Sequence, residues 1–498
     1  MTVAATIDRL LTRGAPGATA LVDRERSVDY AELGARADAV AARLCAEGLV
    51  PGDRVALYGP KSIALVAALF GVWRAGSVAV PVNPVLRGGQ VAHILGNSGA
   101  TLLLTQPARA EALAEAGALG NARVLDLDTL GDGVALPPPV RHTTDDLAAL
   151  LYTSGSTGRP KGVMLSHANL WFAADSVATY LALAADDVAL AVLPLSFDAG
   201  LSVVTSALMA GGSVALVEYL APRDVVKAAE RHRATTLSGV PPLFVQLAEA
   251  DWPEAARTHL RRITVTGGRM PIPVTRRLRA LFPAVRIYLM YGLTEAFRSL
   301  YLDPALVDAH PGSVGGPIPH AHVALLRADG TRAADEEPGE LVHAGPLVAQ
   351  GYWNDADATA RRFRRAPDGL GLGPGMAVWS GDTLRRDADG LHHFVGRDDE
   401  MIKTNGLRVS PTDIEEATYA TGAVSEAAAF GIADARLGQT ILLVAVAAGE
   451  DAAGRLARGL ANVLPAYMRP ARIDWRAALP RSPNGKIDRA ALRAEIGE

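Results

Sequence analysis

The stretch that decides the fold covers residues 151–169 and reads LYTSGSTGRPKGVMLSHAN. It continues an apolar run, residues 147–152, that predicts a buried strand. Its glycines let backbone amides approach anionic oxygens, its hydroxyls donate hydrogen bonds, and the Lys161 ammonium adds a point charge. Pro160 stands where a Walker A loop needs glycine, and Gly162 stands where that loop needs Ser or Thr. We therefore predict a phosphate-binding loop of another kind, rather than a surface loop rich in glycine and serine.

This loop resembles the phosphate loop of the adenylate-forming superfamily, which includes acyl-CoA synthetases, adenylation domains of nonribosomal peptide synthesis, and luciferases. The resemblance implies that ATP and Mg²⁺ activate a carboxylic acid, which then passes to a phosphopantetheine thiol. In this match Lys161 is catalytic. The nucleotide-binding residues of the loop are Thr153, Ser154, Gly155, Ser156, Thr157 and Gly158.

Length and composition limit the alternatives. A chain of 498 residues exceeds what one core usually organises, so two or more domains are expected. A net charge of −4 gives no electrostatic reason to expect nucleic acid or an anionic membrane as partner. Gly211 and Gly212 break the longest uncharged run, residues 199–217, so no membrane span is expected. The N-terminus lacks the features of a signal peptide, which predicts a soluble, cytoplasmic protein.

Cysteine and lysine are both scarce. The single cysteine, Cys45, excludes intramolecular disulfides and is expected to be a small core residue, so a reacting thiol would come from outside the chain. Only five of the 49 basic residues are lysines. Where lysine persists, a compact ammonium is the tool that arginine cannot replace.

Helix and strand patterns alternate through the first half of the chain, which predicts an α/β fold with right-handed crossovers and a mostly parallel sheet. Predicted helices cover residues 27–49, 61–75, 86–98, 200–209 and 222–232, and predicted strands cover residues 54–57, 77–81, 100–104, 187–192 and 213–217. Residues 106–139 are interpreted as a connection. We expect a large N-terminal domain over residues 1–397, with a strand-rich part after Gly312, and a small mobile α+β domain over residues 398–498.

A second motif, Tyr291-Gly292-Leu293-Thr294-Glu295, follows a predicted strand over residues 287–290. Thr294 and Glu295 alone would suit a helix N-terminus, but the full motif is similar to the family's Y-G-x-T-E. That match implies that Thr294 donates to a phosphoryl oxygen and that Glu295 holds Mg²⁺. The resemblance further assigns Gly268, Arg269, Met290 and Tyr291 to nucleotide binding.

A third motif, Trp379-Ser380-Gly381-Asp382, ends in a carboxylate that can accept hydrogen bonds from both ribose hydroxyls. An exposed turn residue is the alternative for Asp382. The resemblance makes Arg397 a second ribose ligand and Asp399 the hinge of the small domain. It also places Lys403 near the adenylate, although a solvated strand position suits Lys403 equally well.

The last motif reads LPRSPNGKIDR over residues 479–489 and is similar to the family's P-x-G-K. The Pro-Asn-Gly turn would project Lys486, and we predict that Lys486 bridges the attacking carboxylate and the α-phosphate. A surface role is the alternative for a basic residue so near the C-terminus. With this motif the resemblance covers nearly the whole chain.

The acid-binding region is predicted around LPLSFDAG, residues 193–200. Phe197 could match the gate of acyl-CoA synthetases, whereas Asp198 resembles the carboxylate that pairs with a substrate ammonium in amino-acid-activating domains. Asp198 could instead cap the helix that follows. Arg298 is either a partner for a second substrate carboxylate or a surface residue. The predicted substrate-binding set is Phe197, Asp198, Ala199, Ser202, Gly267 and Arg298, with Met290 beside it.

The preferred substrate is an amino acid, with a β-amino acid as one option, and the preferred acceptor is a separate carrier protein, because no carrier domain follows Glu498. The alternative is an acyl-CoA ligase for a plain fatty or aryl acid. Motifs of serine hydrolases and dinucleotide enzymes are not found. A luciferase-type oxygenase stays open, and the intact Lys161, Glu295, Asp382 and Lys486 argue against a silent binding protein.

Overall fold

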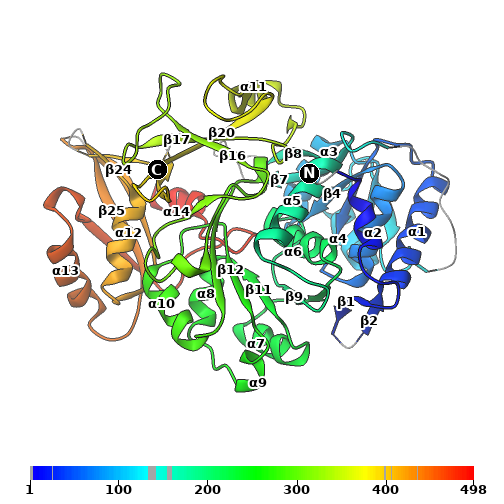
Figure 1. The fold of residues 1–498 in the computed structure, drawn as a ribbon, viewed down its shortest axis with the longest axis horizontal. Helices are drawn as coiled ribbons and strands as arrows, with labels where there is room; N and C mark the ends of the chain where they lie inside the picture. Colours follow the sequence, from blue (N-terminus) through cyan, green and yellow to red (C-terminus); the bar gives the residue numbers. More distant parts are fainter. Residues whose placement is uncertain are drawn as a thin grey trace.

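The computed structural model describes residues 4–24, 26–132, 142–153, 160–397, 400–404, 407–434 and 436–497. Four β-sheets are formed within these ranges. Three belong to the larger part of the molecule, and the fourth lies at the left of Figure 1 with the helices of the C-terminal part.

The first sheet contains the strand that leads into the phosphate loop. In spatial order its strands are β18 (Gly351–Tyr352), β8 (Lys161–Ser166), β7 (Leu147–Thr153), β4 (Val78–Val82), β3 (Arg54–Tyr58), β5 (Leu102–Thr105) and β6 (Arg123–Asp126). The five strands from β7 to β6 pair in parallel, which confirms the parallel arrangement expected here. β7 and β8 form an antiparallel pair, and the predicted phosphate loop lies between them in the sequence.

The second sheet is larger and carries the YGLTE motif at the end of one strand. Its order is β15 (Gly316–Pro317), β14 (Leu300–Leu302), β13 (Arg286–Tyr291), β12 (Arg262–Val265), β11 (Thr236–Gly239), β9 (Val188–Ala191), β10 (Ser213–Leu216), β1 (Thr19–Asp23) and β2 (Arg26–Asp29). The strands from β13 to β1 are parallel. The carboxyl ends of β12 and β13 therefore lie at one edge, where ligands of such sheets bind.

Helices connect and cover these two sheets (Figure 1). They are α1 (Tyr30–Ala46), α2 (Ile63–Arg74), α3 (Gly88–Ser98), α4 (Pro107–Glu115), α5 (His167–Tyr180), α6 (Asp198–Met209), α7 (Pro222–Arg231), α8 (Pro241–Leu247), α9 (Glu254–Arg257) and α10 (Ile272–Leu281). The side chain of Asp29 caps α1 by accepting from the Glu32 amide at 2.7 Å. A Cβ at Gly71 of α2 would lie 2.5 Å from Val40 of α1, so glycine lets the two helices pack closely.

The predicted connection over residues 106–139 was wrong in part. It contains α4 and β6, and β6 is the edge strand of the first sheet. Pro107 is compatible with a helix here, because it lies at the first position of α4, where its missing N–H costs little. The alanine-rich segment is therefore a helix followed by a strand. Residues 133–141 lie outside the described residues.

A strand-rich part follows Gly312, as the turn-rich sequence predicts. Its antiparallel sheet joins β16 (His322–Leu326), β17 (Gly339–Ala344), β20 (Met376–Arg386), β19 (Phe363–Arg365) and β21 (His392–Arg397), and the helix α11 (Ala356–Arg362) lies beside it. In this sheet Asp382 of β20 pairs in register with Arg397 of β21. The pairing places two predicted ribose ligands side by side.

The C-terminal part has its own sheet and core. Its elements are β22 (Ile402–Thr404), β23 (Leu407–Val409), α12 (Pro411–Ala420), β24 (Val424–Asp434), β25 (Gly438–Ala447), α13 (Ala452–Val463), β26 (Arg472–Arg476) and α14 (Arg489–Ile496). Ile414, Leu443 and Leu456 are fully buried in one cluster of this part. The domain boundary near residue 398 stays a prediction, and the predicted hinge Asp399 lies outside the described residues.

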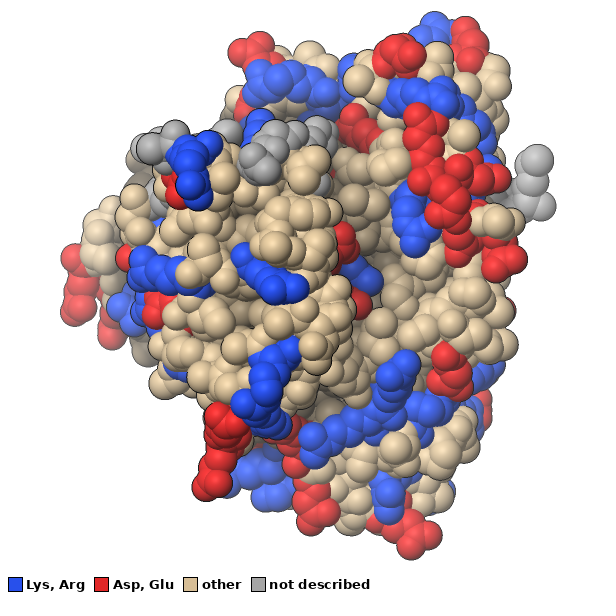
Figure 2. All heavy atoms as spheres, turned by 90° about the vertical axis from the view of Figure 1, so that its left-hand side faces the viewer, with Lys and Arg blue, Asp and Glu red and all other residues tan. Residues whose placement is uncertain are grey.

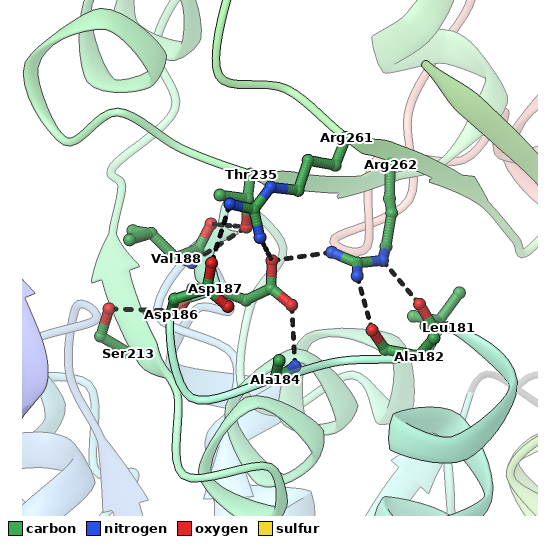
Figure 3. Close-up of polar contacts among 10 residues, drawn as sticks. All are labelled: Leu181, Ala182, Ala184, Asp186, Asp187, Val188, Ser213, Thr235, Arg261 and Arg262. Carbon is green, nitrogen blue, oxygen red and sulfur yellow. Dashed lines mark hydrogen bonds and ion pairs between the residues drawn. The ribbon is translucent and has the colours of Figure 1, made fainter. Parts of the chain in front are cut away.

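A buried ion pair ties β12 to the loop between α5 and β9 (Figure 3). Arg262 Nη1 lies 2.8 Å from Asp187 Oδ1, and both side chains are almost fully buried. Arg262 also donates to the carbonyls of Leu181 and Ala182, and the Ala184 amide donates to Asp187 Oδ2. Every polar group of this pair has a partner, as a structural ion pair requires.

Charges of both signs are mixed on one face of the molecule. Figure 2 shows the side on which α13 and β25 lie, and basic and acidic side chains alternate there without a field of one sign. This distribution agrees with the small net charge of −4.

Candidate active site

A tight turn in the C-terminal part projects Lys486 toward the N-terminal part. Gly485 has φ +79°, which favours glycine, and its amide donates to the Ser482 carbonyl at 2.9 Å. The Ser482 amide donates to the Lys486 carbonyl and closes the turn. Asn83, which follows β4, donates to the Pro483 carbonyl at 3.0 Å. The turn agrees with the Pro-Asn-Gly sequence, and the Asn83 contact holds it beside the end of β4.

Lys486 reaches the loop after β12 and the start of α6. A Cβ at Gly267, just after β12, would lie 2.6 Å from Lys486 Cε, so the glycine makes room for the lysine. Lys486 Nζ lies 4.9 Å from the centroid of the Phe197 ring, a distance at which a cation and an aromatic face attract. Burial lowers the pKa of Lys486, and the Asp198 carboxylate opposes that shift. The protein thus compensates the charge of the Lys486 ammonium only in part, so binding of an anionic ligand beside it would be favourable.

Asp382 lies buried at the strand-rich part. Tyr291 donates a 2.6 Å hydrogen bond to Asp382 Oδ2, and Arg397 Nε lies 3.5 Å from Oδ1. Burial raises the pKa of Asp382, although Arg397 and Tyr291 act to lower it. Oδ1 accepts no hydrogen bond from the described residues. This atom can therefore accept from a ligand hydroxyl, and the exposed-turn alternative for Asp382 is excluded by its burial.

Tyr352 lies next to both Glu295 and Lys161. Thr294 and Glu295 lie in a single 3-10 turn, and the Tyr352 hydroxyl donates to Glu295 Oε1 at 2.5 Å. Lys161 Nζ lies 5.4 Å from the centroid of the Tyr352 ring and 3.1 Å from Asp355 Oδ2. The hairpin of β7 and β8 thus brings the phosphate-loop lysine beside the YGLTE motif.

The remaining loop residues are only partly described. Thr153 ends β7 and pairs in register with Lys161. The predicted ligands Ser154, Gly155, Ser156, Thr157 and Gly158 lie outside the described residues. Their role stays a prediction.

Three further predicted nucleotide ligands are Gly268, Arg269 and Lys403. Arg269 Nε forms an ion pair of 2.9 Å with Glu416 of α12, so it joins the two parts of the molecule. Lys403 is exposed on β22, which matches the solvated-strand alternative in this arrangement. Gly268 lies between Arg269 and the Lys486 contact at Gly267. Their contact with a nucleotide stays a prediction.

The predicted acid-binding residues gather around a small cavity of about 20 Å³. Ala199, Ser202, Met290 and Arg298 line it. Asp198 is the first residue of α6, and its side chain makes no capping hydrogen bond. It pairs instead with Arg298, whose Nη1 lies 2.9 Å from Asp198 Oδ2. Asp198 therefore does not cap α6, and Arg298 is not a surface residue. The capping interpretation of Asp198 and the surface interpretation of Arg298 are both excluded.

A larger cavity of about 360 Å³ is lined in part by Pro483, Asn484 and Gly485 of the Lys486 turn. Lys61 lines it and donates to the Val192 carbonyl at 2.5 Å. Burial lowers the pKa of Lys61 to about 7. Asn83 and Arg109 also line this cavity.

Sequence reasoning missed Tyr352, Asp355 and Lys61 as parts of the site. Tyr352 and Glu295 are 57 residues apart, and no spacing rule connects them. The aromatic pair Tyr352-Trp353 after Gly351 was the available signal. This aromatic pair could be connected with the site only from the pairing of β18 with β8, which the sequence does not show.

A buried carboxylate with one open oxygen, a second carboxylate near Lys161, and a lysine that reaches in from the C-terminal part form the arrangement expected of an adenylate-forming enzyme. The chain belongs to the AMP-binding enzyme family, whose profile matches residues 11–353, and the family's C-terminal domain profile matches residues 413–486.

Similar proteins support this assignment. The chain is 36% identical over 492 residues to a feruloyl-CoA synthase from an Amycolatopsis species, covering 97% of each sequence. It is 33% identical over 501 residues to the L-proline–(L-prolyl-carrier protein) ligase of Pseudomonas fluorescens, again covering 97% of each. The structure of O-succinylbenzoate coenzyme A synthetase from Bacillus subtilis, in complex with ATP and magnesium ion, has a TM-score of 0.86 and 27% identity, covering 98% of this chain and 99% of that one.

The protein is thus an AMP-forming acid–thiol ligase with the mixed α/β fold of adenylate-forming enzymes. No helix among the described residues is long and apolar enough to cross a membrane.

Proposed function

We propose that the protein activates a small carboxylic acid as its acyl-adenylate, releases pyrophosphate, and transfers the acyl group to a phosphopantetheine thiol. The observation that carries this proposal is the position of Lys486, which reaches from the C-terminal part to Gly267 and Phe197. There the ammonium can bridge the acid and the α-phosphate while negative charge accumulates. Positioning and electrostatic stabilisation account for most of the catalysis in such transfers.

The other motifs have complementary roles in this proposal. Asp382 accepts from the ribose, with Arg397 beside it, and the phosphate loop with Lys161 holds the triphosphate. Thr294 and Glu295 offer hard oxygen donors, which suit Mg²⁺, and Tyr352 holds one Glu295 oxygen in place. A bound Mg²⁺ would neutralise charge on the phosphates.

Two versions of the activity differ in acid and acceptor. An amino acid passed to a separate carrier protein is favoured by the Phe197-Asp198 pair and by the likeness to the L-proline ligase. A plain acid passed to CoA is favoured by the likeness to the feruloyl-CoA synthase and by the pairing of Asp198 with Arg298, which leaves that carboxylate less available to an ammonium.

The test measures the two half-reactions separately. Lys486→Ala should lower ATP–pyrophosphate exchange by roughly 10²-fold to 10³-fold, while thiol transfer from supplied acyl-adenylate survives better. Lys227→Ala, on the exposed face of α7, is the control and should behave as wild type. Equal loss in both half-reactions would contradict the role of Lys486. Transfer to CoA or to a carrier protein, offered in separate reactions, identifies the acceptor.

A further inference from the structure

A buried ion pair, whose arginine lines the small cavity, follows a strained backbone turn. The side chains of Arg298 and Asp198 are 4% and 5% exposed, and their charged atoms lie 2.9 Å apart. Phe297 precedes Arg298 with φ +59° and ψ −67°, and the Arg298 amide donates to the Ala296 carbonyl at 2.7 Å. These values define a γ-turn of the rare, strained type. Such strain persists where the surroundings over-determine a conformation, and it is concentrated at ligand sites.

This pair differs from the structural pair Arg262–Asp187 in one respect. Both are equally buried, but every polar group of the Arg262–Asp187 pair has a partner within the protein (Figure 3). Asp198 Oδ1 and Arg298 Nε are buried and make no hydrogen bond with the described residues. An unsatisfied buried polar atom costs about 1–3 kcal/mol, and more when the group is charged. One acceptor and one donor are thus left for a ligand.

The cavity that Arg298 lines is small, and its surface is mostly apolar with several hydroxyl groups in the wall. About 20 Å³ holds one group the size of a water molecule. Its hydroxyl-bearing lining residues are Tyr180, Ser202, Ser206, Thr236, Ser238, Thr264 and Thr266. Thr236 Oγ1 is a further buried atom without a hydrogen-bond partner among the described residues. A long or bulky acyl chain does not suit this space.

The chemistry of the two open atoms selects among small groups. An ammonium has only donors, so it would satisfy Asp198 but leave Arg298 Nε unpaired. The Asp198 carboxylate already pairs with Arg298, and it is the charged group that acts most strongly on Lys486. A substrate ammonium would add a third cation beside this one carboxylate. A carboxylate has only acceptors and would repel Asp198, and a methyl group satisfies neither atom. A hydroxyl both donates and accepts through a single oxygen.

We propose that the acid is a short hydroxycarboxylic acid whose hydroxyl donates to Asp198 and accepts from Arg298. The inference rests on the proposed function, because it concerns the acid that is adenylated. Asp198 and Arg298 then determine specificity for the hydroxyl substituent of the acid, whereas Lys486 acts on the reacting carboxylate.

The test is ATP–pyrophosphate exchange with matched acids. One set is lactate, alanine and propionate, a second is 3-hydroxybutanoate, 3-aminobutanoate and butanoate, and malonate, succinate and ferulate complete the panel. We expect kcat/KM to be roughly 10²-fold or more higher for a hydroxy acid than for its amine and unsubstituted counterparts, because a site built for a hydroxyl rejects analogues that lack it. Best exchange with an amine, an unsubstituted acid, a diacid or ferulate would overturn this inference and leave the proposed function intact. Exchange with no acid, while calorimetry shows that ATP binds, would overturn both.

Variants of the pair sharpen the test. Arg298→Leu frees the Asp198 carboxylate and should move the preference toward the amines, by roughly tenfold or more in the ratio of amine to hydroxy acid. Asp198→Asn frees the guanidinium and should move the preference toward the diacids. Arg262→Leu breaks the equally buried structural pair and should lower the melting temperature without changing the ratios. Unchanged ratios in the folded Arg298 and Asp198 variants would overturn the inference. If these variants do not fold, the substrate panel with the wild-type protein is the test.

Discussion

Tyr291 donates a 2.6 Å hydrogen bond to Oδ2 of Asp382, and this contact joins two motifs that lie 91 residues apart. It occupies one carboxylate oxygen and leaves the other beside Arg397. A carboxylate fixed in this way can receive a ligand hydroxyl without reorganising, which lowers the cost of binding.

Asp382→Asn should therefore weaken ATP binding. The amide has one acceptor oxygen in place of two and no charge, and a hydrogen bond to a charged group contributes about 1.5–3 kcal/mol. We expect the KM for ATP in the exchange reaction to rise by roughly 10-fold to 10²-fold. Asp387→Asn, at the far end of the same hairpin where Asp387 pairs with His393, is the control. An unchanged KM for ATP would rule out the ribose role.

Tyr352→Phe tests whether the tyrosine positions Glu295. The variant keeps the ring beside Lys161 and removes only the hydroxyl that donates to Glu295. Because that bond is charge-assisted, its loss should raise the Mg²⁺ concentration needed for half-maximal exchange by roughly tenfold. Tyr467→Phe removes an exposed hydroxyl and should leave the titration unchanged. Identical Mg²⁺ titrations for the two variants would contradict the prediction.

Gly267→Ala should exclude Lys486 from the site. The new Cβ would lie 2.6 Å from Lys486 Cε, at a backbone φ of +79° that disfavours alanine. We expect exchange to fall by roughly 10²-fold, and the double variant with Lys486→Ala should lose little more than either single one. Gly89→Ala, where a Cβ meets nothing within 4 Å, is the control. Additive losses in the double variant would show that Gly267 acts independently of Lys486.

Buried histidines should make the fold sensitive to acid. Burial lowers the pKa of His343 to about 3 and that of His167 to about 4, below the usual value near 6.5. Between those values the unfolded chain binds protons that the folded chain does not, so stability falls as the pH drops below about 6.5. His343→Asn should show a smaller fall in melting temperature between pH 7 and pH 5 than wild type. His259→Asn should follow wild type, and equal slopes for all three proteins would contradict this origin of acid sensitivity.

Much of the fold could be predicted because its signals are local. The strand β3 and the helix α2 were located to within about two residues by an apolar run and by a helical apolar pattern. β13 was found in the same way, immediately before the YGLTE motif. The helix predicted from residue 27 begins later, at Tyr30, because residues 26–29 form β2 and Asp29 is the cap.

Pairings between distant segments could not be predicted in the same way. The β7–β8 hairpin and the edge strand β6 depend on which strands meet in the sheet, and local patterns do not encode that choice. Lys403 illustrates the same limit at the site, because its motif is intact while its side chain is exposed in this arrangement.

The sequence by itself determined the class of enzyme, since residue types at fixed spacing, such as Thr294 beside Glu295 and Lys486 after a Pro-Asn-Gly turn, specify their chemistry within a few residues. Only the tertiary structure decided how Asp198 is used. Its partner Arg298 lies 100 residues away, and whether a buried carboxylate awaits an ammonium or is already paired depends on which charge the fold brings within hydrogen-bond distance.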